Sequence, residues 1–115
     1  ILVSGHTDNK PLTFGSIYRD NWDLAAARSS SVVQELSGTG KLKPDRMKAI
    51  SYGETKPLAD NKDPKGREKN RRIEIEINYE RSNESTIIII VRFNVYKKIT
   101  SRVNSLIECS QYYLS

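Results

Sequence analysis

Residues 73–79, Ile-Glu-Ile-Glu-Ile-Asn-Tyr, carry the clearest structural pattern in this chain of 115 residues. Apolar side chains occupy every second position, and polar side chains occupy the positions between them. A period of two is typical of a β-strand with one buried face. The stretch therefore predicts a sheet that another element of the chain covers on one side.

The segment from residue 22 to about residue 37 is expected to be the covering helix. Asn21 is a favoured N-cap residue, Asp23 suits the positive end of the helix dipole, and Gly38 is a typical stop signal. Asn21, Leu24 and Arg28 fall together at the border of the apolar face. That face, at helical spacing, consists of Trp22, Ala25, Ala26, Ser29, Val32, Val33 and Leu36.

Three further segments complete the expected fold. Residues 1–4 form a short apolar run closed by Gly5, residues 46–52 form a second candidate strand, and residues 65–70 suit a short helix. Strand, helix, strand, short helix and strand together predict an α/β layer, with a right-handed crossover if the first two strands are parallel. The last strand could run antiparallel to its neighbour.

Composition favours one soluble globular domain and argues against several other classes. Hydrophobic residues make up 37% and charged residues 29% of the chain, with a net charge of +5. The longest apolar run, residues 87–91, is far shorter than the roughly 20 residues of a membrane helix. No Ser, His and acid set and no glycine-rich phosphate loop has motif support, so we expect neither catalysis nor a cofactor.

Asp8 and Arg28 are the strongest candidates for a binding site. Asp8 follows a strand and Arg28 lies in the next helix, so a crossover connection could bring both to one end of the sheet. A carboxylate and a guanidinium together suit a zwitterion, because one holds an ammonium and the other a carboxylate. A plain Asp8–Arg28 ion pair is about as probable from spacing alone.

Four motifs occur across residues 1–79 in the order and with the spacing of a known family. The chain resembles the OmpA-like peptidoglycan-binding domain in Gly5-His6-Thr7-Asp8-Asn9, in Asn21-Trp22-Asp23-Leu24 with Ala27-Arg28, in Tyr52-Gly53-Glu54 with Lys56-Pro57, and in Asn70-Arg71-Arg72-Ile73-Glu74-Ile75.

This resemblance implies non-covalent binding of peptidoglycan through the diaminopimelate residue of its stem peptide. Asp8 and Arg28 would hold that residue, and Asn21 and Leu24 would line the same pocket, although an N-cap and a core contact explain these two about as well. Residues ranked second are Thr7 and Asn9, which flank the acid and are also common turn formers, and Arg71 and Arg72, for which a structural role is favoured.

A complete domain of this family begins with a strand and a long helix ahead of the first motif, so the resemblance implies a domain truncated before Ile1. Residues 1–79 are expected to form the partial domain and residues 80–115 an unassigned tail. An uncovered sheet edge favours self-association, for example a homodimer, unless the run at residues 87–91 covers that edge. The competing view is that the tail is unrelated to the fold and exposes this run.

The motifs look more like those of MotB-type flagellar stator proteins than those of outer-membrane porins, although an outer-membrane or lipoprotein anchor stays an alternative. Either reading implies a parent protein attached to a membrane upstream of Ile1, with this part in the periplasm or cell envelope. A nucleic-acid-binding module is the weaker alternative, based on the basic cluster Lys65, Arg67, Lys69, Arg71 and Arg72. His6 and Asp8 are too few ligands for a metal site, so a structural hydrogen bond is expected for His6.

Overall fold

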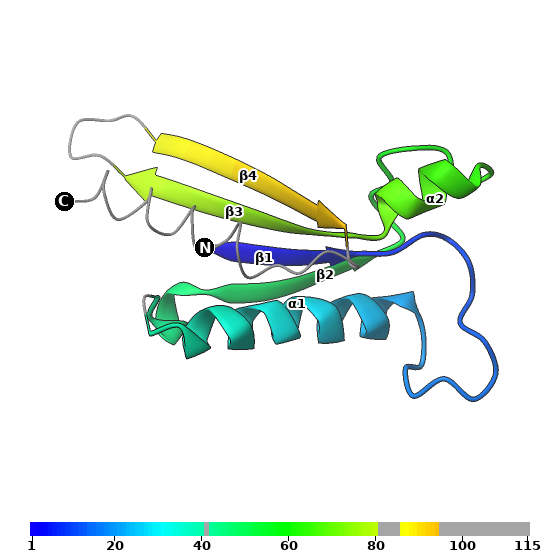
Figure 1. The fold of residues 1–115 in the computed structure, drawn as a ribbon, viewed down its shortest axis with the longest axis horizontal. Coiled ribbons are helices and arrows are strands. Elements are labelled where there is room, and N and C mark those ends of the chain that lie inside the picture. Colours follow the sequence, from blue (N-terminus) through cyan, green and yellow to red (C-terminus); the bar gives the residue numbers. More distant parts are fainter. Residues whose placement is uncertain (41, 81–85, 95–115) are drawn as a thin grey trace.

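The computed structural model describes residues 1–40, 42–80 and 86–94. A mixed sheet with strand order β2-β1-β3-β4 lies against one long helix (Figure 1). The elements in chain order are β1 (Leu2–His6), α1 (Asn21–Gly38), a 3₁₀ turn (Pro44–Arg46), β2 (Lys48–Gly53), α2 (Pro64–Asn70), β3 (Arg72–Glu80) and β4 (Thr86–Asn94).

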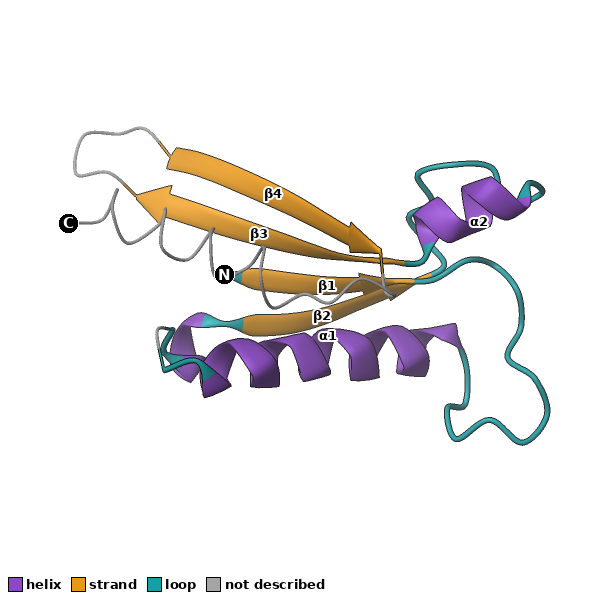
Figure 2. Cartoon of the chain, viewed as in Figure 1, coloured by secondary structure: helices purple, strands orange, loops and turns teal. Residues whose placement is uncertain are grey.

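The topology confirms the α/β prediction. β1 and β2 are parallel neighbours joined through α1, and β3 runs antiparallel on the other side of β1. α1 packs against β1 and β2. Figure 2 shows that α2 lies beyond the end of the sheet where β1 finishes and β3 begins, at the same end as the loop that leads into α1. Three segments distant in sequence therefore meet there.

The core lies between α1 and the face of the sheet that the alternating isoleucines form. Its buried members are Val3, Val32, Leu36, Met47, Ile73, Ile75 and Ile77. α1 approaches β1 so closely that a Cβ atom at Gly5 would overlap the carbonyl oxygen of Ala25. A side chain at that position would force the helix away from the sheet.

The helix was predicted nearly to its ends, but its buried stripe and its cap differ from expectation. Trp22 is 50% exposed and Ala26 is exposed, because the helix contacts the sheet along a narrower stripe. That stripe is Ala25, Ser29, Val32 and Leu36. The N-cap is Asp20, whose carboxylate accepts a hydrogen bond from the Asp23 amide at 2.9 Å. Asn21 is instead the first helical residue, and its side chain hydrogen-bonds to the loop that follows β1.

β4 extends the sheet beyond residue 79. It pairs antiparallel with β3 from Glu80 opposite Thr86 to Arg72 opposite Asn94, so the apolar run at residues 87–91 lies in a strand that covers the β3 edge. Ile90 is half exposed on the face away from α1. The rest of the tail, residues 95–115, lies outside the described residues, and the division of the chain at residue 79 stays a prediction. No helix in the described part is long and apolar enough to cross a membrane.

Candidate functional site

Asp8 lies at the end of the sheet where β1, the start of α1 and the start of β3 converge. His6 at the end of β1 pairs with Arg72 at the start of β3. The residues that follow His6 and those that precede Arg72 are therefore close to each other. This register brings the segment after β1, which contains Asp8, next to Arg71.

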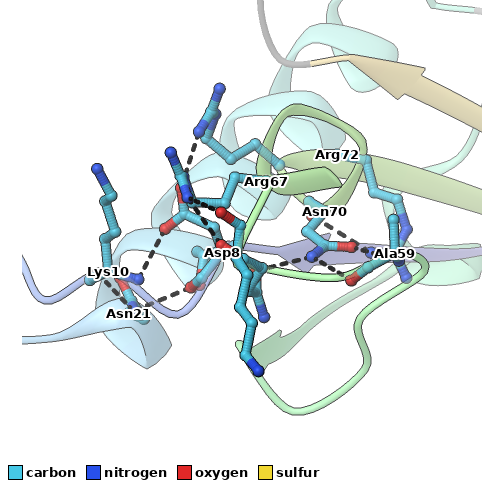
Figure 3. Close-up of polar contacts among 11 residues, drawn as sticks. Asp8, Lys10, Asn21, Ala59, Arg67, Asn70 and Arg72 are labelled. Atoms are coloured by element: carbon cyan, nitrogen blue, oxygen red, sulfur yellow. Dashed lines mark hydrogen bonds and ion pairs between the residues drawn. The ribbon is translucent and has the colours of Figure 1, made fainter. Parts of the chain in front are cut away.

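Asp8 forms an ion pair with Arg71 in place of Arg28. The Arg71 Nη1 atom donates to Asp8 Oδ2 at 2.8 Å, and the Lys10 amide donates to Asp8 Oδ1 at 3.0 Å (Figure 3). The side chains of Asp8 and Arg71 are 11% and 28% exposed, so the pair is partly shielded from water. The simple Asp8–Arg28 ion pair, one of the two expectations for these residues, is therefore wrong.

Arg28 has a buried donor that no acceptor in the described residues uses. Its Nη1 atom is buried and has no hydrogen-bond partner. Arg28 lies about two turns beyond Asn21 on the same side of α1, and a long helical side chain extends back toward the helix N-terminus. Unpaired buried donors are uncommon in folded proteins, since each costs free energy. This one suits an acceptor that arrives with a ligand.

The remaining residues of the first two motifs mostly shape the backbone around Asp8. The Asn21 side-chain amide donates to the carbonyl oxygens of Asp8, at 3.2 Å, and Lys10, at 3.1 Å. The buried Thr7 hydroxyl also donates to the Asp8 carbonyl, at 2.8 Å. Leu24 is half-buried on α1 and Asn9 is exposed. Asn21 thus ties the loop to the helix at the candidate site.

Asn70 and Arg72 have structural contacts of the kind favoured from the sequence. Asn70 is fully buried, and its side chain accepts from the Leu58 and Ala59 amides and donates to the Ala59 carbonyl (Figure 3). The Arg72 guanidinium donates to Glu74, to the Asn70 carbonyl and to the Lys56 carbonyl. Both residues hold the irregular connection before α2 against the start of β3.

His6 is a core residue on the face of the sheet opposite α1. It is 2% exposed, its Nε2 atom lies 3.0 Å from the Ser4 hydroxyl, and its ring stacks on Tyr52. Burial, with a further contribution from the Arg72 charge, lowers the pKa of His6 to about 4. The structural hydrogen bond expected for His6 is present. Among the residues that the structure describes, no group of three His, Cys, Asp or Glu side chains could hold a metal ion.

The basic cluster around α2 is largely occupied by internal contacts. The Arg67 guanidinium donates to the carbonyls of Asn61 and Lys62, while Arg71 and Arg72 make the contacts given above. A groove of about 510 Å³ lies beside α2 and is lined by Leu58, Lys65, Glu68, Lys69, Arg71, Arg72 and Arg92. Arg71 thus borders both this groove and Asp8. Three of the five cluster residues therefore already have partners, which does not favour a nucleic-acid interface.

Comparisons with known proteins agree with the fold and with the motifs. Motility protein B of Bacillus subtilis (strain 168) is 43% identical over 75 residues, which cover 65% of this chain and 28% of that protein. Peptidoglycan-binding protein ArfA of Mycobacterium tuberculosis (strain CDC 1551 / Oshkosh) is 36% identical over 78 residues, which cover 68% of this chain and 22% of that protein. The chain thus spans less than a third of either relative.

The crystal structure of the periplasmic domain of Helicobacter pylori MotB superimposes with a TM-score of 0.58 and 26% sequence identity. The match covers 95% of this chain and 56% of that chain, so it reaches beyond the four motifs. The family model described as OmpA family matches residues 1–71, which is more than half of the chain and includes both Asp8 and Arg28. The chain therefore belongs to the OmpA family.

Proposed function

We propose that this chain is a non-catalytic module that binds peptidoglycan through the diaminopimelate residue of the stem peptide. The side chain of diaminopimelate ends in an ammonium and a carboxylate on one carbon atom. Asp8 would accept hydrogen bonds from the ammonium, and Arg28 would donate to the carboxylate. Both contacts are charge-assisted and therefore among the stronger hydrogen bonds in proteins.

The buried, unpartnered Nη1 atom of Arg28 carries this proposal. If Arg28 served only the fold, its donors would be expected to find acceptors within the chain, as those of Arg72 do. Asp8 also keeps capacity for a ligand, because each carboxylate oxygen accepts one described hydrogen bond and has a second lone pair. The two residues thus offer an acceptor and a donor to a zwitterion.

The relatives support a role in anchoring rather than in chemistry. One is named a peptidoglycan-binding protein and others are motility protein B sequences or periplasmic domains of MotB. We place this chain in the periplasm or cell envelope, where wall binding by the module would anchor a membrane-attached parent protein, most simply a MotB-type flagellar stator. An outer-membrane or lipoprotein anchor would use the same site.

Sedimentation of the full chain with purified sacculi tests the proposal. Wild type is expected to co-sediment, and Asp8→Asn and Arg28→Met should each weaken binding by about 10- to 100-fold, since each removes one charge-assisted contact. Asp8→Asn retains an oxygen that can accept from Arg71, so the local fold has a replacement contact. Asp45→Asn and Arg46→Met are matched controls, because both residues are exposed in the 3₁₀ turn.

Failure of wild type to sediment with sacculi would contradict the proposal. Equal binding by wild type and both site variants would also contradict it, because the wall would then be held elsewhere on the surface. Retention on DNA or RNA that falls steeply with added salt, without binding to sacculi, would instead support the basic cluster as a nucleic-acid site.

A further inference from the structure

The candidate site contains more positive charge than a zwitterion needs. Asp8 supplies one carboxylate, whereas Arg28 and Arg71 supply two guanidinium groups. Arginine stays protonated in proteins, so the three side chains carry a net charge of about +1 when Asp8 is ionised. A neutral zwitterion leaves this excess uncompensated, and a ligand with a further positive charge would be repelled.

Two of the candidate site residues have donors that lack acceptors. Arg28 Nη1 and Arg71 Nε are both buried without a hydrogen-bond partner, and they are two of the three such side-chain atoms in the described residues. Arg71 uses Nη1 to hold Asp8, so its unpaired Nε belongs to a guanidinium that is already fixed in place. Each of these donors suits an acceptor-only group, and a carboxylate is such a group.

We propose that Arg71 is a specificity-determining residue, which together with Arg28 makes the site require a free carboxylate on the side-chain carbon of the ligand. This inference rests on the proposed function and adds the chemical form of the ligand. Stem peptides whose diaminopimelate side-chain carboxyl is amidated would be bound poorly.

The chemistry of the amide explains the discrimination. Amidation replaces an anionic acceptor by a group that is neutral and carries two N–H donors. The ligand side chain then has a net positive charge, and its donors would meet the donors of Arg28 and Arg71. One unpaired contact of this kind typically discriminates strongly, because buried polar groups on both sides are left unsatisfied.

Arg71 also lines a groove next to the candidate site. It borders the groove of about 510 Å³ beside α2, and its side chain is 28% exposed. The groove is otherwise lined by several cations, among them Lys65 and Lys69, which also favour an anionic ligand.

Calorimetric titration of the full chain with two synthetic stem peptides tests the inference. The peptides are identical except that the diaminopimelate side-chain carboxyl is free in one and amidated in the other. Wild type is expected to bind the free acid about 10- to 100-fold more tightly than the amide. Arg71→Met should weaken binding of the acid more than binding of the amide, so that the ratio of the two affinities falls several-fold.

Control variants separate specificity from folding and from general charge. Lys62→Met removes a positive charge from the loop before α2, where Lys62 is exposed and does not line the groove, and its affinity ratio should equal that of wild type. Arg71→Lys keeps the charge next to Asp8 but loses the Nε donor, so an intermediate ratio is expected. Arg71→Lys also replaces Arg71→Met if circular dichroism shows the latter to be unfolded.

The outcomes distinguish this inference from the proposed function. Equal wild-type affinities for the acid and the amide would overturn the inference and leave peptidoglycan binding intact. An affinity ratio unchanged by Arg71→Met or Arg71→Lys would also overturn it, because Arg71 would then only position Asp8. No binding of either peptide by wild type would overturn both.

Discussion

Acidification is expected to destabilise this fold through His6. The folded chain lowers the pKa of His6 from 6.5 to about 4, primarily because burial disfavours the charged ring and secondarily because Arg72 lies near it. In the unfolded chain the ring titrates normally. As the pH falls below about 6.5, the unfolded state therefore binds a proton that the folded state does not, and the free energy of unfolding decreases.

The size of this effect follows from the two pKa values. A full pKa unit corresponds to about 1.4 kcal/mol, so the complete effect approaches about 3 kcal/mol below pH 4. Between about pH 7 and about pH 5 the linkage relation gives a loss of about 2 kcal/mol. This interval is the useful one, because Glu74 contributes at lower pH. Burial alone would raise the pKa of Glu74, but hydrogen bonds from Arg72 and Arg92 lower it.

Urea unfolding at a series of pH values, followed by the fluorescence of Trp22, measures the effect. Wild type should lose about 2 kcal/mol between about pH 7 and about pH 5, whereas His6→Gln should lose much less over the same interval. The two proteins are compared by the slope of their free energy of unfolding against pH. A loss of stability from the missing His6–Tyr52 stack is the same at every pH and does not change that slope. Identical slopes for wild type and His6→Gln would refute the assignment of this pH dependence to His6.

Two further substitutions test contacts that hold the site-bearing end of the sheet together. Gly5→Ala should lower the free energy of unfolding by about 1–3 kcal/mol in urea unfolding, because its methyl group would overlap the rigid Ala25 carbonyl. Gly38→Ala, with no atom within 4 Å of the added carbon, should change it little, and equal effects would contradict the steric argument. Asn70→Ala should cost about 3 kcal/mol, since it leaves several buried backbone groups unpaired, whereas exposed Asn78→Ala should be nearly neutral.

The elements of the fold could be predicted because local signals were strong. The alternation at residues 73–79 placed β3, and the helix predicted from residue 22 to about residue 37 is observed as Asn21–Gly38. The cap was misassigned because Asp20 and Asn21 are both favoured N-cap residues and adjacent. Trp22 was placed in the core because periodicity gives the direction of a face and does not give the width of the contact.

The pairing of the candidate site residues could not be predicted from the sequence. Asp8 and Arg28 were selected as partners because they lie on consecutive elements, whereas the ion pair forms between Asp8 and Arg71. That pairing depends on the antiparallel register of β3 with β1, in which His6 lies opposite Arg72. No local pattern encodes a register between strands so far apart in sequence. The sequence already allowed for an antiparallel last strand. That arrangement was the signal that could have identified Arg71 as a main candidate for the site.

The ion pair that organises the site joins residues 63 positions apart in the chain. A contact of such long sequence separation cannot form until both residues have been synthesised, and closing it costs loop entropy. Asp8 leaves the ribosome or a translocation pore well before Arg71, so an emerging chain has no assembled site. Recognition of a ligand at the proposed site would thus begin only after α1, β2 and α2 have taken their places.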